Sequence, residues 1–165
     1  MKFQKCFILL LGLSGVLSTP LAGQHLITQN GVTLYYELQP DSIEIELFAP
    51  TQGWLAIGFN REDAIVGADL LQFAVTSEGL RAEDQFVRKP QVHPRDTEQN
   101  LRILSFREDQ QGTMVRFKIP MRSGDPQDFE HQTHAPFFLI LAYSAADDFQ
   151  HHSRFRSHLA HQWLP

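Results

Sequence analysis

Histidines are the residues of this chain best suited to chemistry, and half of its eight histidines lie near the end of the sequence. These four are His151, His152, His158 and His161. Imidazole nitrogens bind transition metals and exchange protons near neutral pH. The spacing of the four residues matches none of the common zinc motifs, and no cysteine lies among them. We therefore expect no dedicated zinc site, and we interpret His158 and His161 as surface residues.

The other reactive residue types form no known catalytic pattern. The sequence contains no Gly-x-Ser-x-Gly, no His-Glu-x-x-His, no phosphate-binding loop and no dinucleotide-binding fingerprint. Neighbouring acids such as Glu83 and Asp84 point apart on a strand, and we expect them to be solvated. Four further aspartates fall at expected turns or strand starts, where Asp commonly closes a turn: Asp69, Asp96, Asp125 and Asp128. We expect a binding protein and not an enzyme.

The first residues of the chain have the pattern of a secretory signal peptide. Lys2 and Lys5 precede an uncharged apolar run, Cys6 to Leu17, and small residues follow it. The run is shorter than the roughly 20 apolar residues that span a bilayer. We therefore predict a signal peptide over residues 1–23 and a mature chain over 24–165 that does not span the membrane, in a periplasmic or secreted location.

The composition of the mature chain excludes several classes of protein. Its one cysteine, Cys6, lies in the predicted signal peptide, so disulfides, thiolate metal sites and covalently attached haem are excluded. Without Lys2 and Lys5, the 14 basic residues fall to 12 against 19 acidic residues, a net charge of about −7. An acidic chain lacks the basic patch that phosphate contacts require, so we expect no nucleic-acid partner.

Segments with period-two alternation between turn residues predict the elements that position the histidines. Ser42 to Phe48 alternates clearly, whereas Gly53 to Phe59 is apolar throughout and suits a strand buried on both faces. We expect further strands over residues 32–38, 69–76, 80–87, 100–106, 113–119, 136–143 and 149–159. The fold class is therefore all-β: an antiparallel, immunoglobulin-like β-sandwich of roughly nine to eleven strands in a single domain.

The segment from Arg88 to Glu98 is rich in proline and charge and cannot be a central strand. We expect it to cross the outside of the sandwich as a loop. Most aromatic side chains, Trp54 and Phe59 among them, are expected in the core.

Several segments, taken in order, resemble the DOMON domain family. They are Gly53–Asn60, Val66–Leu70, Pro94 with Asp96, Ser123–Asp128, and Ala142–Tyr143 with His152 downstream. The resemblance covers most of the mature chain. It implies a sandwich like the cytochrome domain of cellobiose dehydrogenase, in which a b-type haem serves electron transfer outside the cytoplasm.

The resemblance also implies the site residues. In haem-binding members a methionine before the Gly-Ala-Asp motif and a histidine near the end of the domain hold the iron. His152 matches the histidine, and Ile65 stands where the methionine is expected. Trp54 and Tyr143 are implied to belong to the same pocket, and the crossing loop, residues 88–98, is implied to pack near Ile65.

Isoleucine has no lone pair to give to iron, so the second axial ligand is left open. His93 in the crossing loop and His151 are candidates. His151 and His152 are adjacent on an expected strand, so both can enter one pocket only across a bulge. The alternative is a haem-free module of the same fold that recognises a sugar, another small ligand or a partner protein. If the chain binds haem, the expected partner is a redox protein.

Overall fold

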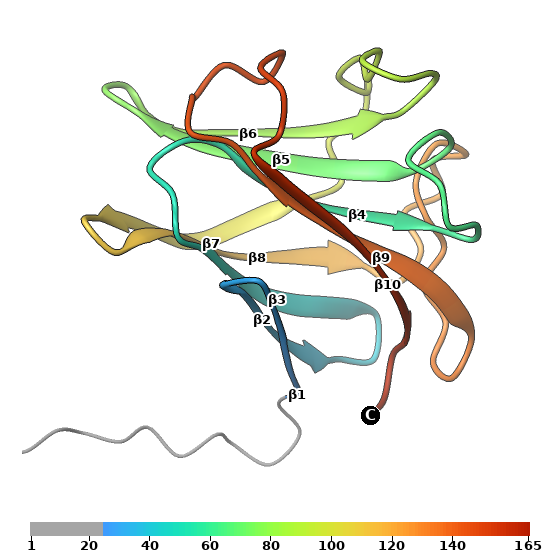
Figure 1. Cartoon of the computed structure of the whole chain (residues 1–165). Helices are drawn as coiled ribbons and strands as arrows, with labels where there is room; N and C mark the ends of the chain where they lie inside the picture. The colour runs from blue at the N-terminus through green and yellow to red at the C-terminus, as the bar shows by residue number, and fades with distance from the viewer. Residues whose placement is uncertain (1–24) are drawn as a thin grey trace, which may run out of the picture.

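Ten strands form two five-stranded antiparallel sheets in the computed structural model, which describes residues 25–165 (Figure 1). The strands are β1 (His25–Gln29), β2 (Val32–Leu38), β3 (Ser42–Ala49), β4 (Leu55–Asn60), β5 (Asp69–Thr76), β6 (Gly79–Phe86), β7 (Arg102–Asp109), β8 (Gly112–Pro120), β9 (Pro136–Tyr143) and β10 (Phe155–Gln162). The predicted all-β sandwich and its number of strands are confirmed. The predicted signal peptide lies outside the described residues.

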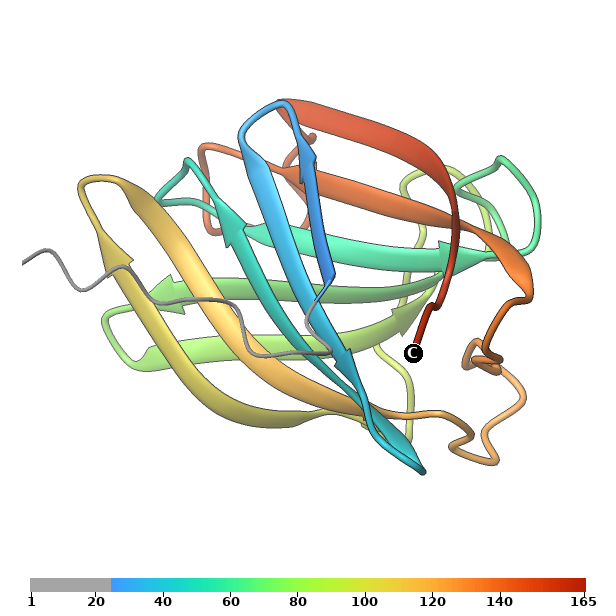
Figure 2. The same cartoon turned by 90° about the horizontal axis from the view of Figure 1, so that it is seen from below.

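The two sheets stack face to face, with strand orders β1-β2-β3-β8-β7 and β10-β9-β4-β5-β6 (Figures 1 and 2). β4 is thus the central strand of the second sheet, between β5 and β9. Trp54 directly precedes β4 and is only 5% exposed, as the charge-free run around it predicts. Among the described residues, no helix has the length and apolar character needed to cross a membrane.

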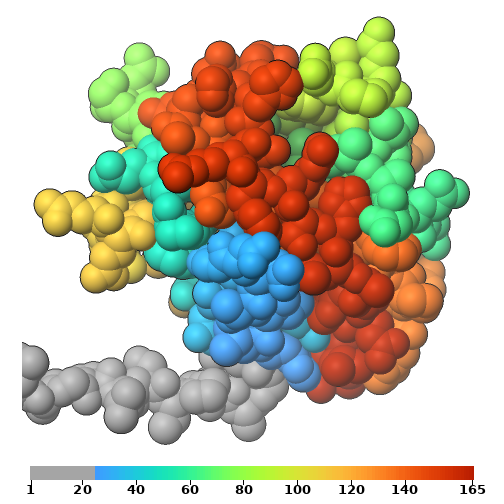
Figure 3. Space-filling model, viewed as in Figure 1, coloured from blue at the N-terminus to red at the C-terminus, as the bar shows by residue number. Residues whose placement is uncertain are grey.

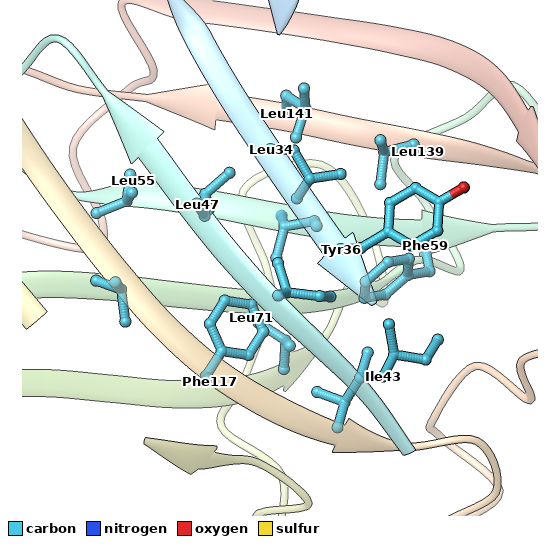
Figure 4. Close-up of a cluster of buried hydrophobic side chains, with 14 of the residues drawn as sticks. Leu34, Tyr36, Ile43, Leu47, Leu55, Phe59, Leu71, Phe117, Leu139 and Leu141 are labelled. Atoms are coloured by element: carbon cyan, nitrogen blue, oxygen red, sulfur yellow. The ribbon is translucent and has the colours of Figure 1, made fainter. Parts of the chain in front are cut away.

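The core lies between the sheets, where inward side chains from both layers meet (Figure 4). In β3 the alternation of Ile43, Ile45 and Leu47 with Ser42, Glu44 and Glu46 places the three aliphatic side chains inward. Phe59 from β4 and Phe117 from β8 fill the space between the two sheets. The period-two pattern of the sequence therefore determines which face of each strand is buried.

A buried polar pair sits at one end of this core. Trp163 Nε1 donates a hydrogen bond of 3.0 Å to His131 Nδ1, and both residues are buried. Burial lowers the pKa of His131 to about 3, so its imidazole is a neutral acceptor at physiological pH. The aromatic rings of Phe59 and Phe137 pack around it.

The structure adds one strand that was not predicted and corrects the start of another. A first strand, β1, pairs with β2 and was not expected. Its sequence, HLITQ, is only five residues long and directly follows the predicted signal peptide, so the alternation is too short to predict a strand. The last strand was expected from Phe149, but β10 begins at Phe155. Asp148 and Gln150 form a turn here, with the Gln150 amide donating to the Asp148 carboxylate at 2.9 Å. His151 and His152 therefore belong to a loop, which removes the expectation that they point to opposite faces.

Candidate functional site

A cavity of about 460 Å³ lies on the outer face of the sheet that contains β4, the face turned away from the core. Its floor comes from side chains of β4, β5 and β9 that alternate with the core residues: Ala56, Leu70, Gln72, Ile140 and Ala142. Pockets of 300 to 1,000 Å³ with an apolar lining and a few polar groups are typical of small-molecule sites. The three strands are buried on both faces because this cavity and its walls cover them.

Small residues create the hollow in the floor. Ala56 and Ala142 face each other directly across β4 and β9. Gly58, next along the same face, lies between Leu70 and Ile140, and a Cβ atom there would come within 3.3 Å of Leu70 Cδ1. Larger side chains at the two alanines would fill the cavity.

One wall is the loop between β9 and β10, which carries His151 and His152. Gln72 of β5 and two residues beside the ends of β4 and β9 hold its backbone: Trp54 Nε1 donates to His151 O (3.2 Å), Ser144 Oγ to His152 O (3.1 Å) and Gln72 Nε2 to Phe149 O (3.5 Å). The loop is thereby fixed to the sheet, and both histidines line the cavity.

The opposite wall is the crossing segment, residues 88–98, which contributes Pro90, Gln91 and His93 to the lining. This segment and the β9–β10 loop both rise on the outer side of the sheet, along the top of the molecule in Figure 3. An isolated bridge between Gln85 of β6 and Arg95 anchors the segment to the sheet edge. The predicted crossing loop is therefore present, and it shares one cavity with Ile65.

Hydrogen bonds determine the tautomer of His93. Gln85 Nε2 donates to the Glu83 carboxylate at 2.8 Å, which turns the amide oxygen of Gln85 toward His93 Nδ1 at 2.6 Å. His93 Nδ1 must then carry the proton, because the Gln85 oxygen beside it can only accept. Burial lowers the pKa of His93. The neutral form of the ring is therefore favoured, and in this tautomer the lone pair that a metal would need is on Nε2.

The loop before β5 brings Ile65 to the same cavity. Asn60 Nδ2 donates to the carbonyl oxygens of Ala64 (2.6 Å) and Val66 (3.0 Å), which fixes the loop on both sides of Ile65. The side chain of Ile65 packs against the outer apolar cluster of the sheet. A thioether could replace it there without changing the shape of the wall.

The structure brings together five of the six site residues expected from the sequence: Trp54, Ile65, His93, His151 and His152. Tyr143 is not among the lining residues, because it lies on the inward face of β9 and packs against the core, with its ring tilted against that of Phe155 at a centroid distance of 5.4 Å. Gln72 was missed, although it is the one polar residue in the central run of β5, DLLQFAVT. Arg156, an exposed residue at the rim, was also missed.

A larger hollow of about 720 Å³ lies at one end of the sandwich, between the loop before β5 and residues 123–130. Its lining is mostly polar and contains no histidine among the described residues. We therefore place the candidate ligand site at the 460 Å³ cavity.

The residues of the cavity fit a b-type haem. The floor is apolar apart from Gln72, imidazoles come from both walls, and Arg156 at the rim offers a cation for a carboxylate. One feature is unusual for a porphyrin site: Gln72 Oε1 is buried in the floor without a hydrogen-bond partner. That atom can accept a hydrogen bond from a ligand.

Two solved structures share this fold. The cytochrome domain of cellobiose dehydrogenase from Myriococcum thermophilum aligns with a TM-score of 0.66 and 9% identity, over 86% of this chain and 82% of that one. The cytochrome b domain of pyranose dehydrogenase from Coprinopsis cinerea aligns with a TM-score of 0.64 and 11% identity, over 83% and 80%. At such identities the likeness concerns the fold alone.

Sequence relatives are found among animal monooxygenase-like proteins. The DBH-like monooxygenase protein 2 of Mus musculus is 28% identical over 120 residues, or 72% of this chain and 19% of the relative. The putative DBH-like monooxygenase protein 2 of Homo sapiens is 30% identical over 114 residues, or 68% and 22%. The match spans only about a fifth of either relative. Residues 28–144 match the DOMON domain, which is more than half of the sequence, and the chain therefore belongs to the DOMON domain family.

Proposed function

We propose that this chain is an exported DOMON module that binds a b-type haem in the cavity on the outer face of its second sheet, and that it transfers electrons outside the cytoplasm. The observation that carries the proposal is the placement of His93, His151 and His152 around one cavity with an apolar floor. The signal-peptide pattern of residues 1–23 supports export to a periplasmic or secreted location. A redox protein is the proposed partner, and no catalytic role is assigned to the chain itself.

In this proposal each residue has a distinct task. His152 would hold the iron, and the bond from Ser144 to the His152 carbonyl holds the loop that carries it. His93 would supply a second nitrogen, in the tautomer that Gln85 imposes. When bound, haem iron carries one electron by alternating between its ferric and ferrous states. Arg156 pairs with a carboxylate at the rim, and the apolar floor excludes water.

A haem-free module is the second candidate, and two observations favour it. Ile65 offers no electron pair at the position where the family resemblance expects methionine. Gln72 Oε1 is buried, unpaired and in the floor of the cavity, where the hydroxyl group of a sugar or another small ligand could donate to it.

The absorption spectrum of protein exported from cells supplied with a haem precursor separates the two candidates. We expect a Soret band for the native chain, its loss in His152→Ala, and a shift toward five-coordinate haem in His93→Ala. His158→Ala is the matched control, because His158 pairs with Asp63 outside the cavity and its loss should leave the band unchanged. Full haem occupancy in His152→Ala would remove that residue from the site. Absence of haem in both the native chain and Ile65→Met would favour the haem-free module.

A further inference from the structure

Two stretches of the chain beside the haem cavity contain no acidic residue, although the chain as a whole is acidic. They are residues 88–95, in the crossing segment, and residues 149–162, which run from the β9–β10 loop through β10. All 19 acidic residues lie elsewhere in the sequence, whereas five of the 14 basic residues lie in these two stretches. The charge of the protein is therefore unevenly distributed, with its basic region at the cavity.

The five basic residues of these stretches are exposed, and none takes part in an ion pair among the described residues. Arg88 lies close enough to the buried Asp96 to oppose the rise of its pKa, so the charge of Arg88 is partly offset. The charges of the other four remain available to a molecule outside the chain: Lys89, Arg95, Arg154 and Arg156.

Two of these four cations stand on the wall formed by the β9–β10 loop and the start of β10. Arg156 lines the cavity and lies directly across from Ala142 of the floor, so both side chains are on the outer face of the sheet. Arg154 comes two residues earlier, and its amide donates to Tyr143 O at 2.8 Å, which fixes its backbone beside the end of β9.

The other two cations stand on the crossing segment. Arg95 forms a bridge with Gln85, so the two side chains point to the same face, and Gln85 contacts His93 on that face. A second bridge, between Lys89 and Val92, closes the tip of the segment around two residues that line the cavity. Both walls of the cavity therefore carry positive charge at the mouth.

The cavity and the larger hollow at the end of the sandwich have opposite charge. The lining of the cavity contains Arg156 and three histidines, and no aspartate or glutamate. The lining of the hollow contains five acidic residues and one arginine. Because a cleft with walls of low dielectric concentrates the field of the charges around it, an anionic surface is attracted to the mouth of the cavity and repelled from the hollow.

We propose that the mouth of the haem cavity is a docking surface for an acidic protein, the redox partner of this chain. This inference rests on the proposed function, because a protein that exchanges electrons with the haem must approach the cavity that holds it. It adds the chemistry of recognition. Carboxylates of the partner would meet Lys89, Arg95, Arg154 and Arg156 around the opening, and they would guide the encounter from a distance.

The charges exceed what a bound haem uses, and their surroundings favour a protein over another polyanion. A haem carboxylate would engage Arg156 at the rim and leave the cations farther out in place. Beside Lys89, the apolar side chain of Val92 is 38% exposed. Protein interfaces combine an apolar centre with a polar rim, whereas an anionic polysaccharide or lipid headgroup requires the basic residues alone.

Stopped-flow reduction of the haem-loaded mature chain by reduced plant-type ferredoxin, an acidic protein of low potential, tests the proposal. The second-order rate constant should fall at least about tenfold between low salt and 0.5 M NaCl. At low salt, the double variant Lys89→Glu/Arg154→Glu should lower it at least about tenfold with an unchanged Soret band. Arg102→Glu/Arg107→Glu, on β7 of the other sheet, changes the net charge equally and should have a much smaller effect.

Binding can also be followed without electron transfer. Titration of the ¹⁵N-labelled chain with oxidised ferredoxin should shift the amide signals of residues 88–95 and 149–156, and these shifts should disappear in Lys89→Glu/Arg154→Glu. This measurement needs no haem. If the haem proposal fails, the kinetic signal is absent, and the amide shifts still decide whether the mouth binds an acidic protein.

Three results would overturn the proposal. Equal slowing by the two double variants would mean that only net charge matters and that the mouth is not a docking surface. Amide shifts confined to another face would place the encounter elsewhere. Binding of heparin or anionic lipid vesicles that Lys89→Glu/Arg154→Glu abolishes, without any response to ferredoxin, would assign the mouth to a polyanion other than a protein.

Discussion

The two outward faces of the sandwich are built from the same kind of strand and yet have opposite chemistry. On the first sheet, β3 and β8 present Glu44, Arg116 and Lys118 to solvent, where they pair with one another. On the second sheet, the corresponding face presents Ala56 and Ala142. The first face follows strict alternation in the sequence, and the second does not.

The difference comes from the connections and not from the strands. The long crossing segment and the β9–β10 loop both stand over the second sheet, and they enclose its outer face as a cavity. The strands of the first sheet are joined by short turns, such as Asn30 and Gly31 between β1 and β2, so its outer face stays open. The cavity of this protein therefore lies where outward strand residues are small, apolar and covered by loops.

The largest contrast between the faces should appear in stability when one aromatic residue is removed from each. Trp54→Ala should cost about 3 to 5 kcal/mol of unfolding free energy, because Trp54 packs in the outer cluster and holds the His151 loop. Tyr35→Ala, on the open face of β2, should cost about 1 kcal/mol or less. Urea unfolding followed by circular dichroism measures both. Equal losses would show that the two faces do not differ in packing.

A larger side chain should weaken haem binding on the covered outer face of the second sheet but not on the open face of the first sheet. Ala142→Trp fills the floor of the cavity and should weaken haem binding at least about 100-fold, or about 2.7 kcal/mol. The fold should persist, since the new ring points away from the core. Glu46→Trp adds the same ring to the open face of β3 and should leave the Soret band unchanged. Normal haem uptake by Ala142→Trp would place the ligand outside this cavity.

The sequence predicted the open face well and the covered face only in part. Alternation in SIEIELF gives the orientation of every side chain in that strand, because one face is solvent and the other is core. The apolar run GWLAIGF predicts a strand that is buried on both faces, but it does not predict which loop covers the outer face. His93 and Ile65 line the same cavity because segments far apart in the sequence are close in space. The periodicity of a single segment gives no information on such contacts.

A cluster of acidic residues at one end of the sandwich, Asp69, Asp84, Asp96 and Asp128, shows the same limit more sharply. Asp84 was expected to be a solvated neighbour of Glu83, and the two do point to opposite faces, but Asp84 faces inward and is 2% exposed. Sequence position gave no sign that Asp69, Asp96 and Asp128, from three other segments, would meet it. The misplaced start of β10 had a local cause, since the Asp148 turn interrupts an otherwise plausible strand.

A substitution in the wall of the cavity should change the absorption spectrum of bound haem, which no substitution on the open face should do. Ile65→Met conserves volume and adds a thioether, so it should cost under about 1.5 kcal/mol in stability. If a second ligand is weak in the native chain, haem affinity should rise about tenfold and the spectrum should gain the features of a His/Met pair. Val66→Met is the control, because the neighbouring Val66 lines the other hollow. The same gain in haem affinity from Val66→Met would show that the effect of the methionine does not depend on the cavity.

The smallest effect should come from the charges of the open face. Burial opposes ionisation of Glu44, but hydrogen bonds from Arg116 and Lys118 outweigh it and lower its pKa. A carboxylate with a lowered pKa stabilises the fold above its ordinary value of 4.5, and this contribution disappears as the pH falls through the lowered value. Glu44→Gln should therefore cost under about 1 kcal/mol at neutral pH, less in high salt, and nothing in strong acid. Urea unfolding at both pH values and two salt concentrations measures these differences. A loss of several kcal/mol that salt does not reduce would mean that this face, like the other, is shielded from solvent.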